Sequence, residues 1–191
     1  MEDTYIEQVE QRRTQREEYF ATNDHSPIPP AQRGEAFPGL DHFPVDPDYR
    51  FELEMHEHDE KEQITVETSA DGVREYLRWG EFQLTVAGEE ITLQAYKSTG
   101  DADHIWVPFR DETNGEETYG AGRYLDLLEE QHRTPDGRWI LDFNMAYNPT
   151  CAFNEAYECP LIPLENWLDI PIEAGEKDYP GEPASPEHHH A

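Results

Sequence analysis

Apolar residues recur at every second position through the middle of the chain, and this period of two constrains the fold more than any other feature. In segments 51–55, 82–86 and 91–95, apolar side chains alternate with charged or polar ones. Such alternation is typical of β-strands that bury one face and expose the other to water. The sequence therefore predicts a mainly β protein.

Short turn signals separate the alternating runs. Asp71-Gly72, Gly88-Glu89, Asn114-Gly115 and Asp136-Gly137 each lie between two runs. Asn-Gly and Asp-Gly pairs favour the positive φ angles that tight hairpins need. We expect an antiparallel meander, with a last strand over 168–172 that follows a long loop over 146–166. Eight or nine strands without intervening helices predict a closed β-barrel or a strongly curved sandwich.

The predicted barrel domain spans residues 23–177, and the two ends of the chain differ from it. Residues 1–22 predict a helix whose inner stripe is thinly apolar, because Arg13 and Arg16 share it with Ile6, Val9 and Phe20. Such a helix is expected to dock on the barrel rather than to stand alone. The segment 178–191 is rich in Pro, Gly and Glu, and we expect it to be a disordered acidic tail.

The chain is strongly acidic along its whole length. It carries 43 Asp and Glu residues against 14 Lys and Arg, for a formal net charge of -29. In dilute buffer these charges repel one another, whereas at about 1 M salt the Debye length falls to roughly 3 Å. An evenly acidic chain with only three lysines favours a halophilic protein. An acidic protein from an ordinary cytosol, or one with acidic disordered ends, is the alternative.

The same charge bears on partners and location. A nucleic-acid binder needs a basic stripe, and an anionic membrane surface attracts basic segments; neither pattern is present. The N-terminal residues show no basic and apolar regions of a secretory signal, and no run of about 18 apolar residues occurs. We therefore expect a cytoplasmic protein that binds neither nucleic acid nor membrane, and its oligomeric state stays open.

Two segments, 107–126 and 141–160, contain more polar side chains than β-strands need. Arginine is scarce here, and its planar group receives carboxylates or phosphates well. Amides and phenols from the second segment could complete a site for a small polar or anionic ligand. The alternative is architectural, with the arginines paired to Asp111 or Asp142 and the asparagines fixing loops. The candidate ligand-binding residues are Arg110, Tyr119, Arg123, Asn144, Tyr147 and Asn148.

Signals for catalysis are thin. No phosphate-binding glycine loop, zinc-protease helix or serine-nucleophile motif occurs. Asp142 is a weak candidate for an acid or base in the same pocket, and no cofactor is indicated. An enzyme of unassigned reaction and a structural or interaction protein are the alternatives to a binding protein.

The cysteines and histidines leave other possibilities open. Cys151 and Cys159 do not have the spacing of a zinc or redox CxxC pair. They could be buried free thiols, a disulfide or, least in keeping with the sequence, metal ligands. His56 and His58 are spaced for one face of a strand, but a solvated strand end accounts for them as well. We expect no metal site.

The polar segments resemble the domain-of-unknown-function family 1684. The resemblance runs through Phe109-Arg-Asp-Glu-Thr-Asn-Gly, Thr118-Tyr-Gly-Ala-Gly-Arg-Tyr-Leu, Asp142-Phe-Asn-Met-Ala-Tyr-Asn-Pro, Cys159-Pro-Leu and Ala174-Gly-Glu-Lys. It covers about residues 12–177, and the acidic composition is similar to that of a haloarchaeal member. The family has no assigned activity, so the resemblance implies none. His42 and Trp167 depart from the family pattern, which often has an aromatic and a basic residue there.

Overall fold

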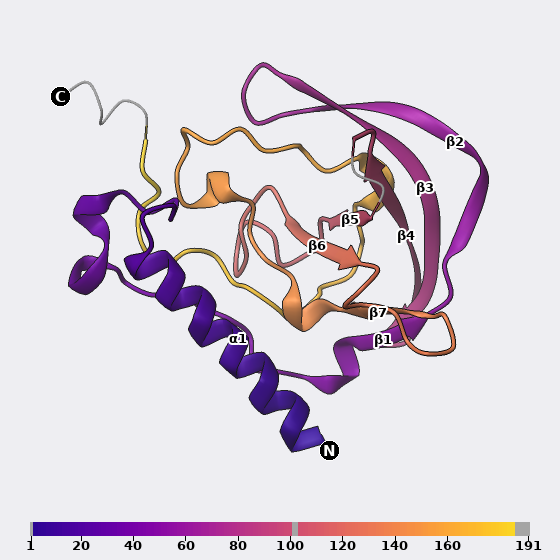
Figure 1. Ribbon diagram of the computed structural model, residues 1–191, viewed down its shortest axis with the longest axis horizontal. Helices are drawn as coiled ribbons and strands as arrows, with labels where there is room; N and C mark the ends of the chain where they lie inside the picture. Colours follow the sequence, from indigo (N-terminus) through magenta and orange to yellow (C-terminus); the bar gives the residue numbers. More distant parts are fainter. Residues whose placement is uncertain (1, 101–102, 186–191) are drawn as a thin grey trace.

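A computed structural model of the protein describes residues 2–100 and 103–185 and contains one α-helix and seven strands in these residues (Figure 1). Four of six short 3-10 turns matter below: η3 (Pro47–Tyr49), η4 (Phe143–Met145), η5 (Thr150–Ala152) and η6 (Leu164–Asn166). The helix and strands are α1 (Glu2–Thr22), β1 (Arg50–Leu53), β2 (His56–Glu67), β3 (Val73–Val86), β4 (Glu89–Ser98), β5 (His104–Phe109), β6 (Arg123–Leu128) and β7 (Trp139–Asp142).

The strands form two antiparallel sheets. Five of them make a curved sheet in the order β2-β3-β4-β5-β6, and β1 pairs with β7 in a separate two-stranded sheet. The β3–β4 turn shows why the hairpin is tight, because Ala87 and Gly88 both have positive φ, at 50° and 84°. The predicted mainly β class, the antiparallel order and the N-terminal helix are thus confirmed.

The main core lies between the two sheets. Alternate residues of β3 to β6, such as Phe82, Leu93 and Val107, pack against Leu141 and Phe143 from the β7 side. The opposite face of the large sheet carries a second cluster built from Tyr96, Trp106 and Tyr124. Strands β4, β5 and β6 therefore bury residues on both faces. Strand β3 keeps the alternation over Phe82–Val86, and β2 is mostly exposed.

The predicted closure into a barrel does not occur among the described residues. The two sheets stay separate, and β4 and β5 share a single register pair, Tyr96↔Trp106. Where these strands diverge, the buried side chain of Asn166 inserts between them. Its Oδ1 accepts a hydrogen bond from the amide of Gln94 at 2.8 Å, and its Nδ2 donates to the carbonyl of Pro108 at 2.7 Å. A side chain thus replaces backbone pairing that a continuous sheet would need.

The strand predicted over 168–172 is also absent. This segment runs beside residues 110–112 and is fixed by isolated bonds, including Leu168 N to Arg110 O at 2.8 Å. The amide of Ile172 donates to the Asp111 carboxylate at 2.7 Å instead of to a backbone carbonyl. The alternation of apolar residues over 168–172 reflects their packing against the core, and not the regular hydrogen bonding of a β-strand.

The helix packs beside the two-stranded sheet and the turns that follow β7. In Figure 1, α1 lies on the side of the molecule away from β2 to β4. Arg13 donates to the carbonyl of Phe43 at 2.8 Å, and Phe20 contacts Phe153 with ring centroids 4.8 Å apart. None of the helices in the described residues is long and apolar enough to cross a membrane.

Part of the predicted disordered tail is packed. Tyr179 is buried beside Phe153, and Ala184 forms a bridge with Asn154. Residues 178–185 therefore belong to the folded unit. The remainder of the predicted tail, 186–191, lies outside the described residues.

Candidate functional site

Arg123, the arginine expected to face a ligand, is fully buried and holds the frame together. Its Nη2 lies 3.2 Å from Asp111 Oδ1 and donates to the carbonyl of Ile172 at 2.8 Å, while Nη1 donates to the carbonyl of Ala174. Burial lowers the pKa of Arg123, and the neighbouring Asp111 carboxylate opposes that shift. The guanidinium thus fastens the irregular 172–176 segment to β6, in agreement with the architectural alternative.

Two asparagines of the second polar segment, Asn144 and Asn148, are buried. Asn144 donates from Nδ2 to the carbonyl of Asp46 at 2.7 Å and to Asp142 Oδ1 at 3.0 Å. Asn148 donates from Nδ2 to the carbonyl of Lys177 at 2.9 Å, and its amide donates to Glu176 Oε1 at 2.7 Å. The hydroxyl of Tyr147 donates to the Asp126 carboxylate. These bonds connect the segment after β7 to residue 46, to β6 and to residues 176 and 177.

The other two predicted residues lie elsewhere. The Arg110 guanidinium stacks over the ring of Trp167 at 4.2 Å. The hydroxyl of Tyr119 lies 3.5 Å from Cys151 Sγ. The six predicted ligand-binding residues therefore occupy several places rather than one pocket.

A cleft of about 240 Å³ lies between α1 and the β1–β7 sheet, and we call it the α1 cleft. Helix residues one turn apart supply one wall, and β1, β7 and the connection before β7 supply the other. The cleft is lined by Tyr5, Gln8, Val9, Arg12, Arg50, Gln131, His132, Ile140, Asp142 and Met145.

Arginine dominates the charge of the α1 cleft. Arg12 makes no ion pair with any residue in 2–100 or 103–185, although the chain carries 43 acidic residues. Arg50 is partly neutralised by Glu52, with Nη1 and Oε2 2.8 Å apart. An unpaired guanidinium in such a chain leaves its fork of N–H donors available to a ligand.

His132 adds a neutral donor to the same cleft. The amide of Leu128 donates to His132 Nδ1 at 2.9 Å, so the ring proton of the neutral form resides on Nε2. Burial lowers the pKa of His132, and the positive charge of Arg12 lowers it further. At neutral pH the imidazole is therefore an uncharged N–H donor beside an arginine.

Asp142, the weak acid–base candidate, is anchored at the wall of the cleft. Its Oδ2 accepts a hydrogen bond from the Tyr5 hydroxyl at 2.5 Å, and its Oδ1 accepts from the amide of Asn144 at 3.0 Å. Burial, followed by the Asp142 carboxylate, raises the pKa of Tyr5. These bonds direct the carboxylate toward α1 and the η4 turn, and they fix the position of the helix on the sheet.

A smaller pocket of about 50 Å³ adjoins the α1 cleft and shares Arg12 and Met145 with it. Arg13, Arg16 and His42 also line this pocket, together with the predicted residues Asn144 and Tyr147. Burial, with Arg13 and Arg16 nearby, lowers the pKa of His42 to about 3. The seam beneath α1 is thus rich in cations and N–H donors.

Comparison with known proteins places this architecture in a family. The family model described as "Protein of unknown function (DUF1684)" matches residues 35–177. The chain belongs to the DUF1684 family. The DUF1684 match begins after α1, so it includes Arg50, His132 and Asp142 but not Tyr5 or Arg12.

A solved relative of this DUF1684 protein matches more of the chain. It is an uncharacterized protein from gene locus rrnAC0354 of Haloarcula marismortui, whose solution NMR structure is 37% identical with a TM-score of 0.68. The similarity covers 92% of this chain and 95% of the relative. No curated protein matches the chain.

Two larger depressions in the DUF1684 protein have a different charge. One of about 670 Å³, beside the β3–β4 turn, is lined by five carboxylates and no basic residue. Another of about 470 Å³, between Trp79 and Trp139, is lined by three glutamates against Lys97 and Arg133. The α1 cleft has a single carboxylate against two arginines, so of these three depressions it is the best suited to an anion.

Reasoning from the sequence of this DUF1684 chain missed Tyr5, Arg12, Arg50 and His132. One signal was present, because Arg13 and Arg16 stand on the otherwise apolar stripe of α1, where a docking helix would normally be apolar. In the described residues, no group of three or more His, Cys, Asp or Glu side chains is placed to hold a metal ion.

Proposed function

We propose that this protein binds a small polar or anionic ligand in the α1 cleft. The observation that carries the proposal is Arg12, which lines the cleft without an ion pair to any described residue of a chain with formal charge -29. The side chain of Arg12 is exposed, so its N–H donors are open to an anion that enters the cleft. Arg50 and the Nε2–H of His132 supply further donors.

The size of the cleft limits the ligand. Its volume of about 240 Å³ is below the roughly 300–1,000 Å³ typical of drug-sized ligands. A short carboxylate or a phosphate of few atoms fits this space. The apolar side chains of Val9, Ile140 and Met145 favour an anion that also carries a small apolar group.

The geometry supports binding more than catalysis. Both oxygens of Asp142 are engaged by Tyr5 and Asn144, so the carboxylate is held in place rather than presented to a reacting atom. Asn144 contributes by positioning Asp142 and the Tyr5 hydroxyl, from which it is 3.1 Å distant. In this proposal Arg123 stabilises the frame and does not contact the ligand.

A binding assay with matched variants tests the proposal. Small carboxylates, phosphate and phosphate monoesters are titrated by calorimetry in 2 M KCl, where non-specific attraction is screened. At least one anion is expected to bind, and Arg12→Gln is expected to weaken it roughly tenfold or more, the loss typical of a charged hydrogen bond.

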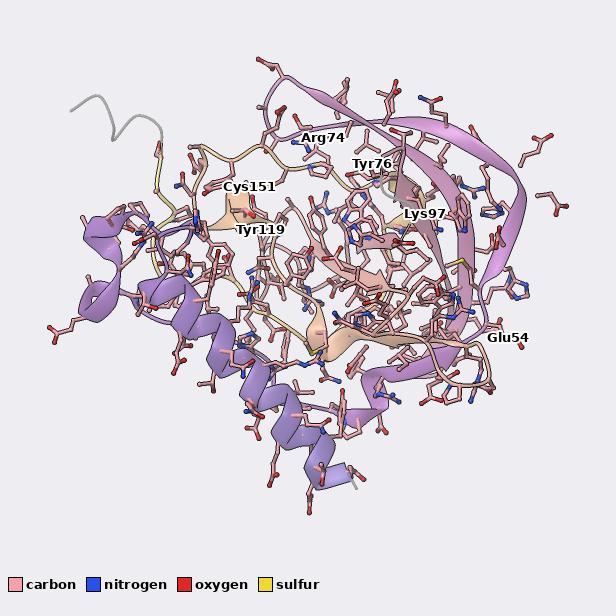
Figure 2. All side chains as sticks on the ribbon, in the orientation of Figure 1. Glu54, Arg74, Tyr76, Lys97, Tyr119 and Cys151 are labelled. Carbon is pink, nitrogen blue, oxygen red and sulfur yellow. The ribbon has the colours of Figure 1, made fainter. Side chains whose placement is uncertain are left out.

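Arg74→Gln is the matched control, because it removes the same charge from an exposed residue on the far side of the molecule (Figure 2). It is expected to change the affinity less than twofold. Equal losses in the two variants would mean that only net charge matters, and the absence of binding by every anion in the panel would refute the proposal.

A further inference from the structure

The two cysteines lie against each other at the surface end of the second polar segment. Cys151 is in η5, and its amide donates to Cys159 Sγ at 3.4 Å. Both are free thiols and buried, with 8% and 7% of their surfaces exposed. Seven residues separate them, so a short loop over 152–158 brings the two cysteines together.

The surroundings distinguish the two sulfurs. A hydrogen bond from the Cys159 thiol lowers the pKa of Cys151, and the Tyr119 and Ser69 hydroxyls lower it further. The same sharing of a proton, followed by burial, raises the pKa of Cys159. Figure 2 shows Tyr119 beside Cys151, and the hydroxyl lies 3.5 Å from Sγ. Cys151 is therefore the sulfur stabilised as a thiolate, which is the nucleophilic form.

Exposed residues flank this pair of cysteines. Ser69 is exposed, and its hydroxyl accepts a hydrogen bond from the amide of Cys159 at 3.1 Å. The loop between the cysteines is exposed over 155–158. Exposed loops are the parts of a fold that open most readily, so we expect local opening of residues 155–158 to admit a small molecule to the sulfurs.

We propose that Cys151 and Cys159 form a redox-active dithiol that reacts with a small peroxide and closes to an intramolecular disulfide. The Cys151 thiolate attacks one oxygen of hydrogen peroxide and the O–O bond breaks, giving a sulfenic acid and a hydroxide that takes a proton from solvent to form water. The sulfur of Cys159 then attacks the sulfenic sulfur, the S–O bond breaks, and the leaving hydroxide takes the Cys159 proton as a second water. The two sulfurs lose two electrons, and the peroxide gains them.

Mass spectrometry of the full chain tests this reaction. After one equivalent of hydrogen peroxide in 2 M KCl, the protein is expected to lose the mass of two hydrogens, to resist alkylation by iodoacetamide, and to yield a peptide that joins the two cysteines. Dithiothreitol should restore both thiols. Two alkylatable thiols after peroxide treatment, or a disulfide between two chains, would overturn the proposal.

Single variants test the separate roles of the sulfurs. Cys159→Ser is expected to leave a sulfenic acid on Cys151 that dimedone traps, whereas Cys151→Ser should slow reaction with peroxide at least tenfold. Tyr119→Phe should slow formation of the sulfenic acid, and Tyr157→Phe, in the exposed loop, should not. Equal reactivity of the two single-cysteine variants would contradict the assignment of Cys151 as the nucleophile.

Discussion

Asp111 and Arg123 form an ion pair whose side chains are both fully buried, with Oδ1 and Nη2 3.2 Å apart. The pair joins the turn after β5 to the first residue of β6, and each partner also bonds the C-terminal segment at Ile172. Because three parts of the chain meet at this pair, we expect it to stabilise the fold that supports the α1 cleft.

Removing one partner of this pair is expected to be costly. Asp111→Asn leaves the Arg123 guanidinium buried without its counter-charge, which should lower the free energy of unfolding by about 3–5 kcal/mol. Chemical denaturation in 2 M KCl measures the change. The control is Glu129→Gln. The side chain of Glu129 is half-exposed and lies 3.2 Å from Arg133, so loss of this ion pair should cost less than about 1 kcal/mol. Similar losses in both variants would show that burial does not determine the cost.

The hydrogen bonds of the Asn166 side chain are expected to stabilise the sheet as much as a backbone hydrogen-bonded pair between β4 and β5 would. Asn166→Leu removes the acceptor for the Gln94 amide and the donor for the Gln94 and Pro108 carbonyls. Each unsatisfied buried group costs about 1–3 kcal/mol, and exchange of the Gln94 amide hydrogen should accelerate strongly. Amide exchange by NMR checks this, with the β3–β4 hairpin as the internal reference. Unchanged protection of Gln94 would disprove the role assigned to Asn166.

The alternation of apolar residues predicted the strands well, but not how they assemble. Burial and strand pairing give the same pattern in sequence. This explains the error at 168–172, where Ile172 is buried and Ile170 partly buried without forming a strand. Closure of a barrel depends on the pairing of β4 with β5, which is interrupted by a side chain from residue 166. That residue is more than 50 positions away from both strands, and no local pattern reports it.

The candidate site was predicted only in part. Asn144 and Tyr147 do lie at the seam beneath α1, since they line the small pocket that adjoins the cleft. Arg123 was predicted to bind the ligand because it is an arginine, but its side chain is buried in an ion pair with Asp111. Whether an arginine forms an ion pair depends on where the carboxylates lie in the folded chain. With 43 carboxylates, spacing in the sequence cannot tell the unpaired Arg12 from the paired Arg123.

Salt is expected to stabilise the protein. At a formal charge of -29 the folded state suffers more self-repulsion than the expanded one, and screening removes most of this as the Debye length shortens to roughly 3 Å at 1 M. The melting temperature should therefore rise with KCl, steeply below about 0.5 M and less above. Calorimetry at constant pH measures this, and a flat profile from low to molar salt would contradict the expectation.

His42 is expected to make stability fall in acid. Its pKa is about 3 in the folded protein, below the ordinary value of about 6.5, so between these values the unfolded chain binds a proton that the folded chain does not. The stabilisation is complete above about pH 6.5 and is lost as the pH falls through this window, with a slope of up to about 1.4 kcal/mol per pH unit. His42→Phe should show a shallower dependence when unfolding is measured from pH 7 to pH 4. Parallel curves for the two proteins would contradict the role of His42.

The most direct measurement for the α1 cleft is the titration of His132 followed by NMR, with and without inorganic phosphate in 2 M KCl. An anion bound beside the Nε2–H of this ring favours the charged imidazolium. The account predicts that phosphate raises the pKa of His132 and that this rise disappears in Arg12→Gln. A His132 titration that phosphate leaves unchanged, or one that shifts equally in wild type and Arg12→Gln, would contradict it.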